Sequence, residues 1–190
     1  MAHRDIMPFI SPSGQTIDIQ HYPMNAAETF VAGEPVRVDA DGNVATCVDD
    51  ATIAGFMGIA LAPSPFSIQG TLTNRDPQTG AAYATGASIP IAIARQGCRF
   101  ISDNFSTGGG GVAVVPTLAV IGDTVGVIVT GGVWFFDVGL TAANMMFRIT
   151  DVLDANKNSL KDPRFSGNVG VFVVADVTAN QLTVVTAPEA

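Results

Sequence analysis

The chain has 190 residues, with nine Lys and Arg against 17 Asp and Glu and a net charge of −8. This balance disfavours a nucleic-acid binder, which carries basic groups to neutralise phosphates. Hydrophobic residues make up 47% of the chain and charged residues 14%, a composition that argues against disorder and allows one domain with a substantial core.

The two lysines, Lys157 and Lys161, are few for a freely soluble monomer, whose surface normally mixes charges of both signs. We therefore expect much of the surface to face another protein. Two long uncharged stretches, 51–74 and 104–122, contain glycine and proline, so neither predicts a membrane-spanning helix. The N-terminus does not read as a signal peptide, and a soluble product made in the cytoplasm is expected.

Residues 1–31 are predicted to form an extended N-terminal arm. They contain three prolines and scattered apolar residues, a pattern that forms no regular element by itself but suits an extended chain in a groove. A first strand over Gln15 to Gln20 is compatible with the arm. The apolar side chains expected to contact a partner are Ile6, Met7, Phe9, Ile10, Ile17, Ile19 and Tyr22.

Residues 32–190 predict an all-β domain, either a β-barrel or a jelly-roll-like sandwich. Val36 to Asp39 alternates apolar and polar residues, Asp41-Gly42-Asn43 supplies a turn, and Val44 to Val48 resumes, which together predict a hairpin. Further strands are predicted at 53–61, 89–95, 97–101, 112–115, 124–130, 133–138, 169–177 and 182–186.

Two segments are harder to assign. Residues 63–88 are rich in proline and glycine and are predicted to form a loop excursion from the domain. Leu140 to Leu153 fits a helix on its spacing, but Met145 to Thr150 fits a strand, which we favour after a turn at Thr141 to Asn144.

Residues suited to metal binding or catalysis are sparse. Cys47 and Cys98 are far apart and are expected to be free thiols, and with His3 and His21 as the only histidines a zinc site is not expected. Asp39 to Asn43 and Asp154 to Asn158 resemble the start of calcium loops but lack the later ligands, so Asx turns are predicted.

The remaining candidates are also explained best by structure. The run Gly108 to Gly111 lacks the Lys-Ser/Thr of a phosphate loop and is predicted to be a turn between strands. The aromatic residues Trp134, Phe135 and Phe136 fit a core or a subunit interface better than a sugar-stacking platform. No catalytic residues, metal or cofactor are therefore predicted.

Short glycine-based motifs between residues 32 and 101 carry a family resemblance. They are Ala32-Gly-Glu-Pro-Val-Arg-Val38, Asp41-Gly-Asn-Val44, Gly55-Phe-Met-Gly-Ile-Ala-Leu61, and Ile89-Pro-Ile-Ala-Ile-Ala-Arg95 followed by Gly97-Cys-Arg-Phe100. In this series the chain resembles the small β-barrel of tailed-bacteriophage capsid decoration (cement) proteins. The N-terminal arm and the strands expected over 124–186 are additions to the small members of that family.

The resemblance implies a non-enzymatic virion protein on the outer surface of the capsid, where a homotrimer would clamp neighbouring major capsid subunits. The acidic charge fits a position away from packaged DNA. We expect the arm to lie along capsid subunits and Trp134 to Phe136 to close the trimer. The alternative is a β-sandwich carbohydrate- or receptor-binding module of a phage tail or head fibre, using Trp134, Tyr83 and the 63–88 excursion. A hydrolase with acids assembled in space ranks third.

Overall fold

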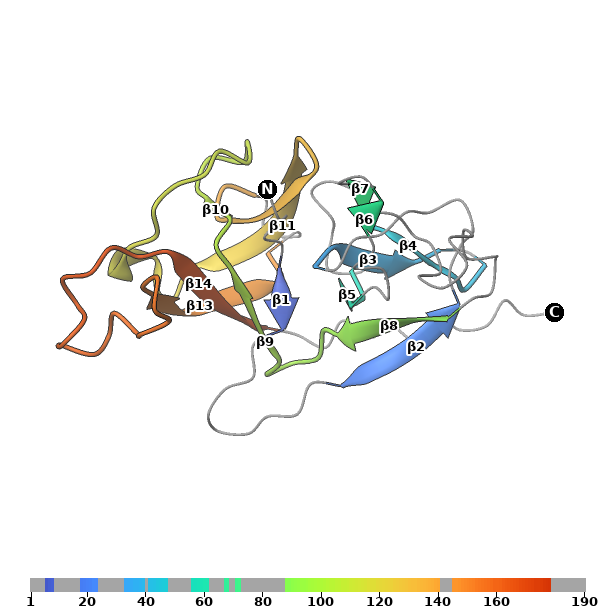
Figure 1. Cartoon of the computed structure of the whole chain (residues 1–190), viewed down its shortest axis with the longest axis horizontal. Coiled ribbons are helices and arrows are strands. Elements are labelled where there is room, and N and C mark those ends of the chain that lie inside the picture. Colours follow the sequence, from blue (N-terminus) through green and yellow to red (C-terminus); the bar gives the residue numbers. More distant parts are fainter. Residues whose placement is uncertain are drawn as a thin grey trace.

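The computed structural model describes residues 6–8, 18–23, 33–39, 41–47, 56–61, 67–68, 71–72, 88–140 and 145–178. This part of the chain is all-β, as predicted, with a seven-stranded sheet, a five-stranded sheet and a two-stranded ribbon. Figure 1 shows the two main sheets side by side. Among the described residues, no helix has the length and apolar character needed to cross a bilayer.

The seven-stranded sheet has the order β1-β9-β14-β13-β11-β12-β10. Its neighbours pair antiparallel except β10 and β12, which are parallel. β9 and β10 follow each other directly in the chain, yet four other strands lie between them in the order of the sheet. The sheet must therefore curl around its own core to bring β10 back to the end of β9. Its strands are β1 (Met7–Pro8), β9 (Arg99–Ser102), β10 (Phe105–Ser106), β11 (Thr124–Thr130), β12 (Val133–Asp137), β13 (Phe147–Leu153) and β14 (Phe172–Val177).

The five-stranded sheet is antiparallel throughout, with the order β2-β8-β5-β3-β4. Its strands are β2 (Ile19–Pro23), β3 (Pro35–Val38), β4 (Val44–Thr46), β5 (Gly58–Ala60) and β8 (Ser88–Ile93). The ribbon consists of β6 (Ser67–Ile68) and β7 (Thr71–Leu72), and one 3-10 turn, η2, covers Leu118–Val120.

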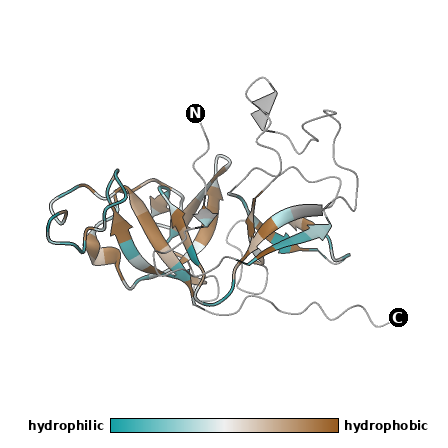
Figure 2. Ribbon diagram, turned by 60° about the horizontal axis from the view of Figure 1, so that its bottom comes forward, coloured by the Kyte–Doolittle hydropathy of each residue, from teal (hydrophilic) through white to brown (hydrophobic). Residues whose placement is uncertain are grey.

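One hydrophobic core joins the two sheets. Phe147 of β13 lies at its centre and makes edge-to-face ring contacts with Phe56, Phe100 and Phe136, at centroid distances of 5.4, 5.9 and 5.1 Å. Phe56 precedes β5 of the smaller sheet, whereas Phe100 and Phe136 belong to the larger one. Each buried aromatic side chain stabilises the fold by about 1.5–3 kcal/mol. In Figure 2 the strands of the larger sheet are mainly hydrophobic, whereas those of the smaller sheet have both hydrophobic and hydrophilic stretches.

Several predicted strands are confirmed. The hairpin forms with Val36 opposite Thr46 and Val38 opposite Val44. The strand at 124–130 has the predicted bounds, and the strand favoured at Met145 to Thr150 overlaps β13, which begins at Phe147, with no helix among residues 145–153. The strand expected over 53–61 is confined to Gly58–Ala60 in the described residues. A Cβ on Gly58 would lie 2.3 Å from the carbonyl oxygen of Ala92, so only glycine allows β5 to pair with β8 there.

The strand predicted at Val112 to Val115 is wrong. These residues form no ladder, and the N–H of Val114 donates a single hydrogen bond of 2.8 Å to the carbonyl of Phe105. The glycines before this segment turn the backbone, because Gly109 and Gly111 have φ values of 68° and 61°, so the chain does not continue as a strand beside β10. The continuous apolar run was therefore no evidence of pairing.

The described parts of the predicted arm belong to the two sheets. Met7–Pro8 pairs with β9 of the larger sheet, and Ile19–Pro23 pairs with β8 of the smaller one. Much of the predicted excursion over 63–88 lies outside the described residues, apart from the ribbon and the start of β8. The strand predicted at 182–186 also lies outside them.

Candidate interaction surface

A group of exposed apolar side chains follows the glycine run. Val112, Val114 and Val115 are 72, 42 and 59% exposed, and Leu118 in η2 is 40% exposed. Val169 is 68% exposed and lies about fifty residues further along the chain, just before β14. Contiguous exposed apolar side chains commonly mark sites where a protein contacts another molecule.

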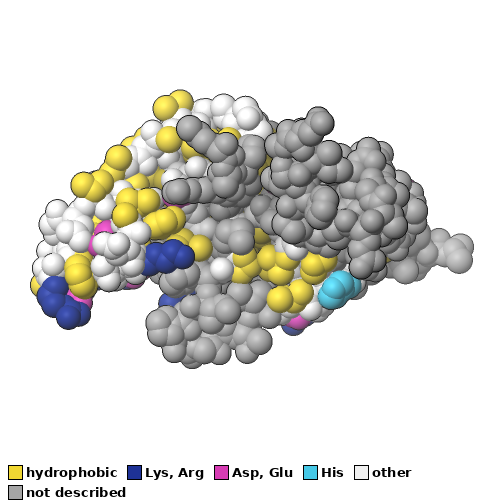
Figure 3. Space-filling model, in the orientation of Figure 1, with side chains coloured by type: hydrophobic (Ala, Val, Ile, Leu, Met, Phe, Trp, Pro, Cys, Tyr) yellow, Lys and Arg dark blue, Asp and Glu magenta, His cyan; other side chains and the backbone are white. Residues whose placement is uncertain are grey.

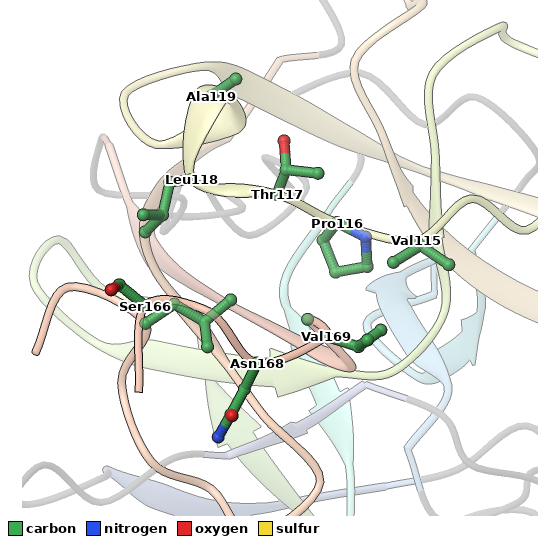
Figure 4. Close-up of a pocket in the computed structure, with 10 residues that line it drawn as sticks. Val115, Pro116, Thr117, Leu118, Ala119, Ser166, Asn168 and Val169 are labelled. Carbon is green, nitrogen blue, oxygen red and sulfur yellow. The ribbon is translucent and has the colours of Figure 1, made fainter. Parts of the chain in front are cut away.

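Three of these side chains, those of Val115, Leu118 and Val169, line a depression between two chain segments, which we call the groove from here on. One wall is residues 115–119, and the other is formed by Leu160, Ser166 and residues 168–170. The groove has a volume of about 460 Å³. Figure 4 shows Pro116 and Val115 across the space from Val169, with the side chain of Asn168 pointing away from it.

A close backbone contact fixes the distance between the walls. A Cβ placed on Gly170 would lie 2.1 Å from the carbonyl oxygen of Pro116 and 2.9 Å from Cγ1 of Val152. Only glycine lets the two segments approach this closely. Both Gly170 and Pro116 are buried, so they form the floor rather than the rim of the groove.

Asp154 anchors the wall that contains Val169. Its carboxylate accepts hydrogen bonds from the backbone N–H groups of Asn156 and Asn158, at 2.8 and 2.9 Å, and from the side-chain amide of Asn168, at 2.7 Å. Burial opposes ionisation of this carboxyl group, but the hydrogen bonds from Asn158, Asn168 and Asn156 outweigh it and hold its pKa below the usual value. The anchored carboxylate thus ties the end of the loop to its start.

The Asx turns predicted at the two aspartates are confirmed. Asp39 accepts hydrogen bonds from the N–H groups of Asp41 and Asn43, at 3.0 and 2.8 Å, and Asp154 makes the corresponding pair. Within the described ranges, no group of three or more His, Cys, Asp or Glu side chains is placed to hold a metal ion.

The glycine run binds a carboxylate that belongs to the chain itself. The N–H of Gly109 donates to both oxygens of Asp137, at 3.0 and 3.1 Å, and the N–H of Gly139 and the hydroxyl of Ser106 donate to the same carboxylate. Asp137 is fully buried at the end of β12. These donors are therefore occupied by an internal acceptor, and the run is a turn that leads into the groove wall.

The aromatic residues predicted at a subunit interface are core residues. Trp134, Phe135 and Phe136 are 2, 7 and 0% exposed within a single chain. Both faces of β12 are covered. The curled sheet covers one face, and the run Gly108 to Gly111 covers part of the other, where a Cβ on Gly111 would lie 3.5 Å from the Phe135 ring. The subunit-interface assignment of these side chains is therefore corrected: they stabilise the chain's own fold.

The residues predicted as arm contacts differ in burial and in the sheet to which they belong. Ile6 is fully buried in the shared core, and Tyr22 packs on the core of the smaller sheet and donates to Gln20 at 2.9 Å. Ile19 is 52% exposed on β2, and Met7 pairs with Ile101. Phe9, Ile10 and Ile17 lie outside the described residues, as do Tyr83 and His3.

The two thiols and the remaining histidine are separate features. Cys47 and Cys98 are not joined by a disulfide, as expected, and Cys47 is buried. Burial raises the pKa of Cys47 to about 12, against a smaller lowering effect of Arg37. His21 is exposed on β2.

Sequence reasoning missed the groove, because Val112 to Val115 and Val169 had been assigned to strands. Pro116 directly after the apolar run, with glycines before it, was the available signal against a strand. No family model matches the chain, and neither the curated proteins nor the solved structures contain a match to it.

Proposed function

We propose that this chain is a structural virion protein that binds the outer surface of a tailed-phage capsid and cements neighbouring major capsid subunits. The observation that carries the proposal is the groove, which exposes Val115, Leu118 and Val169 on a surface of fixed shape. Exposed apolar side chains around a preformed depression suit contact with another protein.

Two further features support the proposal. The motifs that resemble the decoration proteins include β3, β5 and most of β8 of the five-stranded sheet, and the last motif reaches the start of β9 in the larger sheet. The net charge of −8 suits a location away from packaged DNA, because a protein in contact with the phosphates would benefit from basic groups.

Binding to phage heads tests the proposal directly. Heads of the phage that encodes this chain, assembled without it, are mixed with the purified full-length protein and sedimented. We expect saturable binding at a fixed ratio to the major capsid protein, new density on the outer surface by cryo-electron microscopy, and a higher temperature of head disruption. Binding that does not saturate, or density on the inner surface, would refute the proposal.

The arm contacts need substitution rather than deletion. Removing residues 1–31 would also remove β1, β2 and the buried Ile6, so a loss of head binding could result from unfolding. Replacing Phe9 and Ile10 with Asp is the sharper test, and Ile19→Asp tests the same predicted contact at a described position, where the side chain is 52% exposed. Weaker head binding by the Phe9 and Ile10 variants supports an arm contact, and unchanged binding contradicts it.

The carbohydrate- or receptor-binding alternative has less support. A stacking platform needs an aromatic face that a sugar can reach, and Trp134 is 2% exposed. A glycan titration of the full-length chain separates the two proposals, because the cementing proposal expects head binding without glycan binding.

A further inference from the structure

A row of charged side chains lies on the face of the larger sheet that points away from the core, which we call the outer face. The strand registers place Arg99 of β9 and Arg148 of β13 on either side of Asp176 of β14. Their neighbours along the strands, Phe100 and Ile149, are buried in the core, so the alternation of a strand directs the row outward. Arg99 and Asp176 form an ion pair of 2.9 Å, and Arg148 is exposed.

The two lysines of the chain lie further along the same strands. The Nζ of Lys161 donates to the carbonyl of Thr150, two residues after Arg148 on β13. The Nζ of Lys157 is 6.0 Å from the centre of the Phe172 ring. Phe172 begins β14, four residues and about 13 Å before the row of charges. The basic residues spread over this length are called the basic stripe: Arg99, Arg148, Lys157 and Lys161.

The basic stripe separates charge on an acidic chain. The described acidic side chains among it are Asp151 and Asp176, so four basic and two acidic residues give this surface a net charge of +2. The rest of the chain contains five basic and fifteen acidic residues, a net charge of −10. Both acidic groups are bound within the fold, Asp176 by the hydroxyl of Thr150 at 3.0 Å and Asp151 by the hydroxyl of Ser159 at 2.8 Å. Figure 3 shows Lys and Arg side chains on the side of the molecule that contains the larger sheet.

Most of the positive charge in the stripe has no acidic partner in the fold. Within the described ranges, the basic members of ion pairs are Arg95, Arg99 and Arg164, so Arg148 and the two lysines are uncompensated. Lys157 also has a φ of 63°, a left-handed conformation that glycine and asparagine adopt at lower cost. It is the one non-glycine residue with a positive φ in the part of the chain that the structure describes. A lysine at such a position indicates a role for its side chain.

We propose that the basic stripe binds an acidic segment of the partner protein, which is the major capsid protein if the proposed function, on which this inference rests, holds. The fitting segment presents carboxylates at alternate positions of an extended chain, because three such positions span about 13 Å, the length of the stripe. Charges matched in this way orient the two proteins and raise their rate of encounter.

A nucleic acid does not fit the stripe. Its phosphates continue beyond about 13 Å on both sides and would meet the surfaces that carry the charge of −10, whereas a protein segment can place its acidic groups only where the stripe lies. At physiological ionic strength, exposed charges further apart than about 8 Å are largely screened, so the distant acidic groups of this chain do not cancel the local attraction.

Sedimentation of phage heads with the full-length protein, at about 0.05 M salt, tests the inference through charge reversal. Arg148→Glu and Lys161→Glu should each raise the Kd roughly threefold to tenfold, because each replaces an attraction by a repulsion. Arg148→Lys keeps the charge and should leave the Kd within about twofold. Arg95→Glu is the matched control: it changes the net charge by the same amount, at a side chain that is 46% exposed and already paired with Asp18.

Salt provides a second measurement. Raising the salt to about 0.5 M should weaken head binding by the unmodified protein more than binding by the double variant with Arg148→Glu and Lys161→Glu, which has lost the attraction that salt screens. Circular dichroism of every variant checks that the fold is retained.

The outcomes separate this inference from the proposed function. Weaker binding by the stripe variants alone, with Arg148→Lys unchanged, supports the acidic partner. Equal binding by the unmodified protein and the double variant overturns the inference and leaves cementing in place, as does an equal loss on Arg95→Glu, which would be an effect of net charge. Binding to double-stranded DNA that the double variant loses would assign the stripe to nucleic acid instead. An unmodified protein that does not bind heads refutes the proposed function and this contact with it.

Discussion

The contact between Gly170 and Pro116 predicts a large effect from a single methyl group. In Gly170→Ala the new Cβ would lie 2.1 Å from the Pro116 carbonyl oxygen, whereas ordinary contact begins at 3.4 Å, so the two backbones must separate by about 1.3 Å. The Cγ1 atom of Val152, 2.9 Å away, closes a second direction. Overpacking of this kind costs about 1–3 kcal/mol.

Urea unfolding followed by circular dichroism measures this cost. We expect Gly170→Ala to lower the free energy of unfolding by about 1–3 kcal/mol, and each kcal/mol lowers the thermal midpoint by about 2–4 °C in a chain of this size. Gly167→Ala is the matched control in the same loop, because a Cβ there meets no atom within 4 Å. Its effect should lie within about 1 kcal/mol and can be stabilising.

The comparison between the two glycines also tests the groove. Because Gly170 sets the separation of the walls, Gly170→Ala should weaken the proposed binding to phage heads along with stability, whereas Gly167→Ala should leave head binding unchanged. Equal stability of the two variants would refute the reasoning, since it would mean that the walls move apart freely and that the groove has no fixed shape.

Three further predictions concern the buried polar groups. Asp137→Ala leaves buried N–H and O–H donors without their acceptor, so we expect a loss of about 1–3 kcal/mol in urea unfolding, against little change for the exposed Asp123→Ala. The folded-state pKa of Asp154 lies below its usual 3.8, so the ionised Asp154 stabilises the fold above that pH, and this stabilisation is lost as the pH falls through the folded-state pKa. Asp154→Asn should therefore reduce the loss of stability with falling pH. An unchanged loss of stability at acid pH would contradict the lowered pKa of Asp154. With a pKa of about 12, Cys47 stays protonated at neutral pH and should react with a thiol reagent only after unfolding. The partly exposed Cys98 should react first. Equal reaction rates of the two thiols in the folded protein would contradict this prediction.

Local sequence patterns predicted most strands of the larger sheet and the first hairpin. At residues 36–46, alternation and an Asp-Gly-Asn turn act over a few residues, and the Asp39 carboxylate completes the turn within the same segment. The strand at 124–130 could be read for the same reason, since its β-branched residues and its flanking glycines are contiguous. Such features depend on neighbours in the chain, which the sequence displays directly.

The candidate site depended on contacts between distant segments. Trp134 and Val115 are both apolar residues in apolar runs, yet one is 2% and the other 59% exposed. What separates them is whether another part of the chain covers them, and hydropathy does not encode this. The interface predicted at Trp134 to Phe136 was therefore core, and the exposed apolar surface lay in a segment predicted as a strand.

The sequence by itself determined that this protein is an acidic, apolar, all-β chain, because composition and strand propensity are properties of residues and their neighbours. Only the tertiary structure decided that Pro116 meets Gly170 and that Val115, Leu118 and Val169 surround one groove. The physical reason is that burial and close approach arise from the packing of segments some fifty residues apart, where the space available to a single Cβ decides how the walls fit together.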